Sequence, residues 1–302
     1  MKVNQTMKDS PSELFFKFMI ALFCTTLVIV TLYPVYFVVI ASISNPASVA
    51  NGDIWLFPNN ITFAGYIEIF NDDRIWRGLK NTFIYTIGGT VVSLLFTIPA
   101  GYALSRVDFT ARKFLMFFFV FTMFFSGGLI PTYLTVQQFG LTNTIWVMLI
   151  PFSVNVFNLI ITRVFFQTTL PKELLESAKL DGSTDFQFFL RIALPLSKAL
   201  IAVMMLYYAV GYWNEYMKAL IYLNDSKLYP LQLVLREILV MNQAFSSGAG
   251  SQMLSTGDVT AQQKGDLIKY GVIVVSSVPI LLVFPFVQKY FEKGVMIGSL
   301  KD

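Results

Sequence analysis

The side chains that most often carry out acid–base chemistry or bind metals are scarce in this sequence. It contains no histidine and a single cysteine, Cys24. Without histidine, Ser-His-Asp triads and the common zinc sites are excluded, and one cysteine can form neither an internal disulfide nor a thiolate cluster. No lysine is followed by serine or threonine, so the phosphate-binding motif G-x-x-x-x-G-K-[ST] is absent. The sequence therefore predicts a chain that neither catalyses such reactions nor binds ATP through this motif.

Charged and small residues gather in one stretch of this otherwise apolar chain, residues 167–197. Pro171 suits the start of a helix, with Thr169 before it as an N-cap, and Gly182 can adopt the positive φ that ends such a helix. A second short helix is expected after the Asp181-Gly182 turn. Together the two helices are expected to form a protruding knob that a partner protein would bind. The first helix is expected to pack through Leu174, Leu175, Ala178 and Leu180.

The composition indicates that this knob belongs to a membrane protein. Of the 302 residues, 55% are hydrophobic and only 13% are charged, and the mean hydropathy is +0.63. A soluble domain carries about 25% charged residues. The net charge is +4, but the 22 lysines and arginines form no basic block, so nucleic acid is not an expected partner.

Six stretches are long and apolar enough to cross a bilayer core, which takes roughly 20 residues per helix. The first is too long for a signal peptide and has no small-residue cleavage pattern, so an uncleaved helix is expected. The uncharged run over 114–162 is expected to break at the polar turn 137–143. The sequence predicts an all-α protein with a single transmembrane domain over residues 1–302. Its helices are expected at about 16–41, 79–105, 114–136, 144–166, 198–222 and 268–291.

The positive charges predict the orientation of these helices. Arg106, Arg112 and Lys113 lie between the second and third helices, the next link has no lysine or arginine, and the 167–197 stretch is basic again. By the positive-inside rule, both termini and the 167–197 stretch are cytoplasmic. Residues 223–267 then lie outside, with an amphipathic stretch at 231–241 and a Gly/Ser-rich stretch at 244–257. Both a loosely ordered loop and a docking element for an extracellular partner remain open interpretations.

The 167–197 stretch also carries a motif. Glu176-Ser177-Ala178, Asp181-Gly182 and Ile192-Ala193-Leu194-Pro195 resemble the EAA loop of ABC importer permeases, which reads E-A-A, three residues, G, then I-x-L-P. Ser177 replaces the family's first alanine, a change between small residues. The resemblance covers nearly the whole chain and is to carbohydrate permeases of the maltose-transporter type, most of all the polysaccharide and oligosaccharide permeases. Further similar segments are 124–134, 157–167, Trp213-Asn214-Glu215 and 293–298.

This resemblance implies a type I ABC importer permease fold in which residues 167–197, the coupling loop, bind a cytoplasmic ATPase. Glu176 would pair with a basic ATPase residue, Ser177 and Ala178 would keep the contact face slim, Gly182 would allow the turn and Asp181 would cap it. Leu194 and Pro195 complete the motif. The C-terminal tail, Glu292–Asp302, resembles the segment that reaches between the two ATPases in the maltose-type permease.

The path for substrate is a looser inference. Aromatic rings stack on the C–H faces of sugars, and polar side chains bind their hydroxyl groups, so the density of such residues in the fifth helix suits an oligosaccharide path. An interfacial aromatic belt, a Glu215–Lys218 ion pair and hydrogen bonds between helices remain open alternatives. The candidate path residues are Tyr208, Tyr212, Trp213, Asn214, Glu215, Asn155 and Asn158.

The resemblance implies one subunit of an ATP-driven carbohydrate importer in the bacterial cytoplasmic membrane. Its expected partners are a second, different permease, two ATPases that bind ATP and Mg, an extracellular solute-binding protein and a carbohydrate, with no cofactor in this chain. Two other functions remain open. A stand-alone channel or facilitator leaves the coupling loop without a purpose, and a polytopic hydrolase lacks a convincing nucleophile–base pair.

Overall fold

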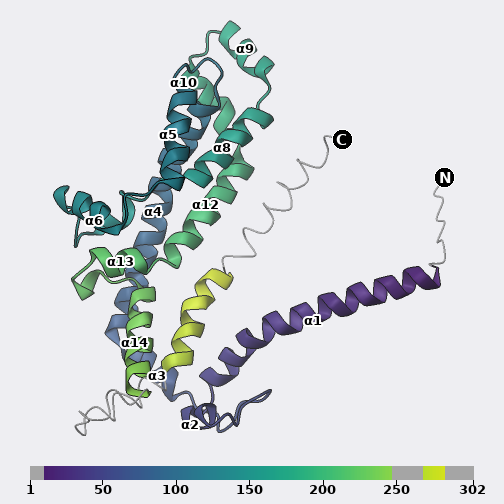
Figure 1. The fold of residues 1–302 in the computed structure, drawn as a ribbon, viewed down its shortest axis with the longest axis vertical. Helices are drawn as coiled ribbons and strands as arrows, with labels where there is room; N and C mark the ends of the chain where they lie inside the picture. Colours follow the sequence, from purple (N-terminus) through teal and green to yellow (C-terminus); the bar gives the residue numbers. More distant parts are fainter. Residues whose placement is uncertain (1–9, 247–267, 283–302) are drawn as a thin grey trace. The chain divides into compact units, whose positions relative to one another are not determined.

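The computed structural model describes residues 10–246 and 268–282, and within these ranges the chain is helical with no β-strand. The all-α prediction is thus confirmed for the described residues. They fall into two compact units, which we describe separately. One comprises residues up to 71 with 241–275, and the other comprises residues 72–240 with those from 276 onwards. Figure 1 labels the helices along the chain.

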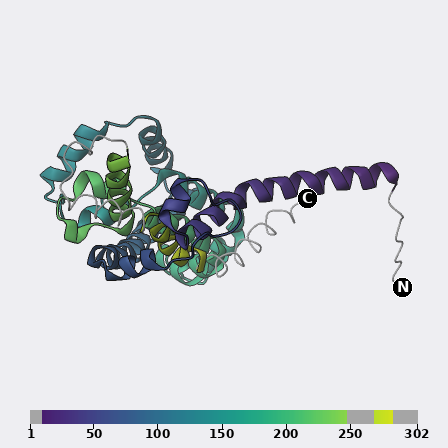
Figure 2. The same ribbon diagram turned by 90° about the horizontal axis from the view of Figure 1, so that it is seen from below.

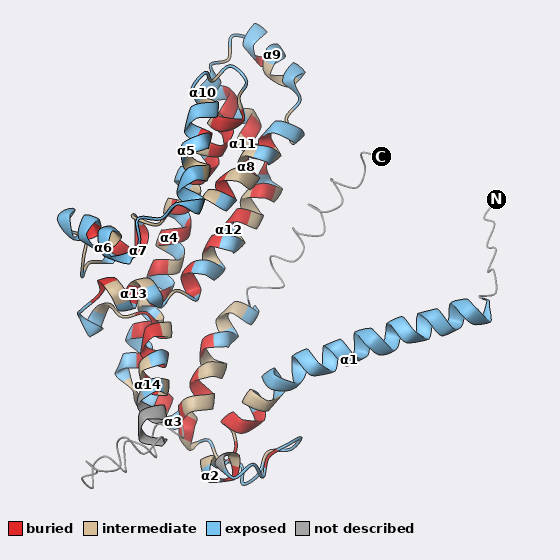
Figure 3. Cartoon of the chain, viewed as in Figure 1, coloured by how far each residue is buried: buried red, intermediate tan, exposed pale blue. Residues whose placement is uncertain are grey.

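The first unit is dominated by α1 (Pro11–Ser42), which continues with α2 (Pro46–Ala50) and α3 (Ala64–Asn71). Neither α2 nor α3 was expected from the sequence. α1 is long and apolar enough to cross a membrane, and it forms one continuous helix (Figure 2). Its side chains are exposed along most of its length and become buried only at its C-terminal end (Figure 3). A helix that exposes an apolar surface on all sides is suited to contact with lipid.

Three helices form the centre of the second unit: α4 (Asp73–Ser105), α8 (Val156–Thr169) and α12 (Lys198–Trp213), with α4 packed against the other two. Glycines permit the close packing. A Cβ on Gly101 would lie 2.4 Å from Thr162 Cγ2, and one on Gly89 would lie 2.4 Å from the Tyr212 ring. Buried hydroxyl pairs also join α4 to α12. Thr97 and Tyr208 are 2.6 Å apart, and Ser93 and Tyr212 are 3.1 Å apart.

The structure divides the helix expected at 114–136. α5 (Arg112–Phe124) and α6 (Leu129–Gln138) are separated by residues 125–128 and bend by 120°. Gly128 has φ +84°, a conformation that side-chain-bearing residues rarely adopt. The Ser126-Gly127-Gly128 sequence, although it lies within an apolar run, therefore follows the end of α5 and separates it from α6.

Two other expected helices are also interrupted. Within 144–166, α7 (Ile145–Leu149) is followed by the irregular residues 150–155 and then by α8. Pro151 lacks the N–H that a continuing helix needs. Within 198–222, α12 ends at Trp213 and α13 (Met217–Tyr222) begins after a three-residue break. Both breaks lie in largely apolar stretches. Apolar composition indicates that a segment can be buried in lipid, but it does not indicate whether its helix is continuous.

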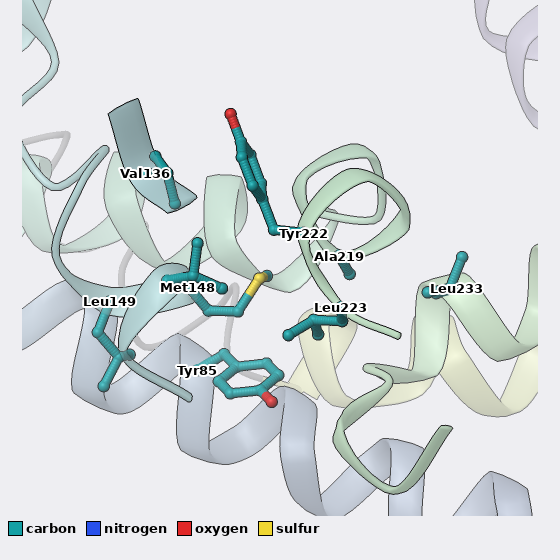
Figure 4. Packing of buried hydrophobic residues seen from close by; sticks show 9 residues of the cluster. Tyr85, Val136, Met148, Leu149, Ala219, Tyr222, Leu223 and Leu233 are labelled. Atoms are coloured by element: carbon teal, nitrogen blue, oxygen red, sulfur yellow. The ribbon is translucent and has the colours of Figure 1, made fainter. Parts of the chain in front are cut away.

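A buried hydrophobic cluster lies near the N-terminal half of α4. Tyr85, Met148, Tyr222 and Leu223 belong to a buried cluster drawn from several helices (Figure 4). The Tyr85 hydroxyl donates to the Leu228 carbonyl at 2.7 Å. The amphipathic stretch expected at 231–241 lies within α14 (Leu231–Ser246). The last described helix is 268–282. The rest of the helix expected at 268–291, most of the 244–257 stretch and the C-terminal tail lie outside the described residues.

Candidate functional site

The first helix of the coupling loop is α9 (Lys172–Leu180). Pro171 occupies its N-cap position with φ −61° and ψ 141°, without a side-chain hydrogen bond. Thr169, expected as the N-cap, is instead the last residue of α8. Leu170 lies before the proline and is extended, with φ −94° and ψ 111°, because a proline disfavours helical conformation in the preceding residue. The proline thus separates α9 from α8.

Gly182 ends α9 in the left-handed conformation that the sequence predicts, with φ +77°. The Gly182 N–H donates to the Lys179 carbonyl at 3.1 Å, and the Ser183 N–H donates to the Ala178 carbonyl at 2.9 Å. These are the two hydrogen bonds of a Schellman motif. Asp181 holds the C-cap position through its backbone N–H, which donates to the Ser177 carbonyl at 3.0 Å.

The packing face of α9 is confirmed for Leu174, Leu175 and Ala178, which pack into one buried cluster, but two details differ from the expected arrangement. Glu176 and Ser177 are exposed, and the Ser177 hydroxyl donates to the Glu173 carbonyl at 2.9 Å. Ala178 is only 7% exposed and packs into the chain's own core, so it does not belong to the slim contact face expected for it. Leu180 is 90% exposed and does not join the packing face. Both corrections follow from helical periodicity, because Ala178 shares a face with Leu174 and Leu175, whereas Leu180 projects elsewhere.

Four charged side chains connect the coupling loop to the link between α4 and α5. Arg106 contacts Asp108 at 2.5 Å and Asp185 at 3.0 Å, and Lys179 approaches the same carboxylates at 3.3 and 3.7 Å. The hydrogen bond from Arg106 holds the pKa of the Asp108 carboxyl well below its usual range. Because Arg106 is 12% exposed, the network tethers α9 and α10 (Asp185–Phe188) to the end of α4. From the sequence, Arg106 served only to predict orientation, and this network was not predicted.

An aromatic core lies next to these charges. The Tyr102 ring packs against Phe166, Phe188 and Phe189, with centroid distances of 5.4, 6.4 and 4.9 Å. From α10 the chain continues through a π-helical turn (Phe189–Ala193) and α11 (Leu194–Leu196), and this segment meets α12 at 79°. Leu194 is half-buried and Pro195 is exposed in α11. The coupling loop is therefore packed directly onto α4, α8 and α12.

A cleft of about 600 Å³ opens beside α9. Its walls are the α4–α5 link, the end of α8 and α9 itself. Glu176 and Lys179 are among the lining residues, as are Arg106 and Tyr102. The exposed edge of α9 thus borders a hollow with both charged and aromatic surfaces.

A second, smaller pocket of about 150 Å³ gathers five of the seven candidate path residues. It lies where the breaks in the α7–α8 and α12–α13 segments meet. The Tyr208 hydroxyl accepts from the Asn155 N–H at 3.3 Å, and the Asn155 side chain accepts from the Asn158 N–H at 3.2 Å. The lining residues are Phe152, Asn155, Asn158, Tyr207, Tyr208, Gly211, Tyr212, Glu215 and Lys218.

The other two candidates do not line this pocket. The Trp213 indole donates to the Ser276 carbonyl at 3.2 Å and packs edge-on against Phe83. The Asn214 amide donates back to the Val210 carbonyl at 2.9 Å and is exposed. Helical periodicity could have shown this, because Trp213 lies about 100° around the helix from Tyr212.

The comparison with known families decides the identity of the chain. Residues 75–297 match the family described as the binding-protein-dependent transport system inner membrane component. The chain belongs to this family. It is accordingly a membrane-embedded, non-catalytic permease subunit of an ABC transporter, in which partner ATPases hydrolyse ATP. The resemblance inferred from the EAA-like motif is confirmed.

Individual relatives agree with this assignment. The chain is 42% identical over 286 residues to the polygalacturonan/rhamnogalacturonan transport system permease protein YtcP of Bacillus subtilis, covering 95% of this chain and 96% of the relative. It is 40% identical over 272 residues to Protein LplC of the same organism, covering 90% of each. Among solved structures, it resembles a chain from a bacterial ABC transporter involved in the import of the acidic polysaccharide alginate. That match has a TM-score of 0.83 at 32% identity and covers 95% of this chain and 100% of the other.

Proposed function

We propose that this permease couples to its ATPases through α9 and conducts a carbohydrate, an oligosaccharide or glycan fragment, through a path shared with a second permease. The exposed Glu176 and Ser177 on α9, held in place by the Arg106 network, carry the proposal. The names of two relatives, which refer to polygalacturonan/rhamnogalacturonan and alginate transport, support a carbohydrate substrate.

The rigidity of the coupling loop supports its role in transmitting force. α9 is fixed at its start by Pro171, at its end by the Gly182 turn and along one face by Ala178. Lys179 in α9 and Asp185 in α10 are bound to the α4–α5 link. An ATPase that moves α9 would therefore move the ends of α4, α8 and α12 as one body, as a rigid-body transition requires. Glu176 would pair with a basic ATPase residue, and the exposed Leu180 would fill an apolar site on it.

We further propose six membrane spans, with both termini and the coupling loop in the cytoplasm. α1 and α4 are each long and apolar enough to span a membrane, and the bent pairs α5–α6 and α10–α12 are so if each pair is one span. The interrupted 144–169 segment and the helix beginning at Ile268 would complete the set. The contact of the α4–α5 link with Lys179 and Asp185 supports placing both links on the same side of the membrane.

The remaining partners follow from the same assignment. We propose a heterodimer with a second permease, two ATPases that bind ATP and Mg, and a solute-binding protein that delivers the carbohydrate from outside. Asn155, Asn158, Tyr208, Tyr212 and Glu215 would line this chain's half of the path. Trp213 and Asn214 would act in packing.

Co-isolation of the ATPase with the assembled permeases tests the proposal. Glu176→Lys reverses an exposed charge without touching the core, so we expect the ATPase to be lost while the two permeases remain paired. Glu13→Lys, which reverses an exposed carboxylate in the first turn of α1, is the matched control and should retain the ATPase. Retention of the ATPase and of ATP-dependent uptake by Glu176→Lys would contradict coupling through α9.

A further inference from the structure

The 150 Å³ pocket contains a lysine in an unusual setting for a membrane protein. Lys218 is 29% exposed, and its ammonium group lies 2.7 Å from Glu215 Oε2. The same nitrogen lies 5.4 Å from the centre of the Phe152 ring and 5.7 Å from that of Tyr212. Ionisable residues within membrane segments are costly and mark functional sites by default. The pocket thus combines a cation with flat apolar surfaces on which a sugar ring can stack.

The acidic partner of Lys218 already accepts hydrogen bonds from within the chain. Glu215 Oε1 accepts the Lys218 backbone N–H at 3.0 Å, and Oε2 faces the Lys218 ammonium. Asn155 Oδ1 accepts the Asn158 N–H. A lysine has three donors and no acceptor, so donors of Lys218 remain for a ligand, whereas each of these three oxygens already accepts a hydrogen bond within the chain. The pocket therefore favours a ligand that brings acceptors.

Asn158 adds an amide group to the lining of the pocket. The residue as a whole is 7% exposed. An amide offers both a donor and an acceptor, which suits a carboxylate and an adjacent ring hydroxyl together.

We infer that this pocket binds the carboxylate-bearing ring of an acidic sugar, a uronate, with Lys218 as the partner of the carboxylate. The inference rests on the proposed carbohydrate transport and specifies its substrate class. Phe152 and Tyr212 would contact the ring, and Asn158 would bind polar groups next to the carboxylate. The volume is below the 300–1,000 Å³ typical of drug-sized ligands, so the pocket holds one ring while the chain passes through.

Uptake by the complete importer in proteoliposomes tests this inference. The probes are a trimer of galacturonate and its fully methyl-esterified, neutral form. The same binding protein delivers both probes to every variant, so a change in their uptake ratio between variants belongs to the permease. Lys218→Met should lower uptake of the acid by roughly tenfold or more, as loss of a charge-assisted hydrogen bond implies, and should leave the ester within about twofold. Lys218→Arg should restore most of the uptake of the acid.

Two further variants separate ligand binding from a structural role. Glu215→Gln keeps an acceptor for the Lys218 N–H and removes a negative charge that would repel the uronate carboxylate, so the ratio of acid uptake to ester uptake should rise. If Lys218 served only to pair with Glu215, Glu215→Gln would impair uptake as Lys218→Met does. Lys227→Met removes an exposed lysine outside the pocket and should change neither probe.

The remaining outcomes distinguish this inference from the proposed function. Equal losses of both probes in Lys218→Met, or no loss of either, would overturn the uronate assignment. Wild-type uptake of the ester without the acid would overturn it as well and would leave carbohydrate transport standing. A wild-type complex that retains its ATPases but transports neither probe nor any neutral oligosaccharide would overturn the carbohydrate function itself.

Discussion

The turn at Gly182 offers a graded test of the coupling loop. Its φ is +77°, and a Cβ at this position would meet no atom within 4 Å, so a substitution acts through the backbone alone. A residue with a Cβ pays about 1–2 kcal/mol in this conformation, which reduces the population of the native turn by a factor of roughly 5–30. Asparagine tolerates the conformation better than alanine. Proline fixes φ near −65° and removes the N–H that bonds to Lys179, at a cost of about 3 kcal/mol or more.

The assay is the apparent affinity of the purified ATPase for the permease pair. We expect this affinity to fall in the order Gly, Asn, Ala, Pro at position 182. Gly182→Ala should weaken the affinity by roughly fivefold or more, and Gly182→Pro should weaken it by more than roughly 100-fold. The matched control is Gly128→Ala, because Gly128 also has a positive φ, +84°, and nothing within 4 Å. It should lose thermal stability but keep its affinity for the ATPase. Equal affinity across the Gly182 series, or an equal loss in Gly128→Ala, would refute the reasoning.

Two further predictions concern the packing of α4 against α12 and the charge network around Asp108. Gly89→Ala places a Cβ 2.4 Å from the Tyr212 ring, whereas Gly88→Ala meets only the tip of a flexible leucine at 3.3 Å. Overpacking costs about 1–3 kcal/mol, so Gly89→Ala should lower the thermal unfolding midpoint in detergent more than Gly88→Ala, and equal midpoints would contradict the close packing. The lowered pKa of Asp108 means that its stabilising contribution is complete above the unfolded pKa of about 3.9 and is lost only as the pH falls through the lower folded value. ATPase affinity should therefore not change between pH 8 and pH 5, and Asp108→Asn, which imitates protonation, should weaken it by about 1 kcal/mol or less because Asp108 is half exposed. Loss of affinity near pH 6 in the wild type would contradict this.

The features of the coupling loop that depend on neighbouring residues could be predicted from the sequence. A proline at the start of α9 and a glycine at its end are local signals, since each acts on its own backbone. The left-handed Gly182 was predicted in this way. The tether through Arg106 and Asp185 could not be, because these residues are 79 positions apart and no local pattern brings them together.

The pocket of about 150 Å³ was only partly predictable from the sequence for a related reason. Aromatic and amide residues marked α12 and the start of α8 as candidates, and four of them, together with Glu215, line one pocket. The breaks at 150–155 and 214–216 that form the pocket lie inside largely apolar stretches, where composition cannot distinguish a continuous helix from an interrupted one. Lys218 was weighed only as a partner of Glu215, because its two ring contacts depend on the tertiary fold.

Cross-linking from α9 tests the central claim most directly. With the single natural cysteine replaced by Cys24→Ser, one cysteine is introduced at a time into the assembled importer and fitted with a short photoactivatable cross-linker. Ser177→Cys and Leu180→Cys place it on the exposed surface of α9, whereas Ala178→Cys places it in the core. Coupling through α9 predicts covalent products with the ATPase from positions 177 and 180 and none from 178. Absence of ATPase products from both exposed positions in a complex that still hydrolyses ATP and transports would contradict it.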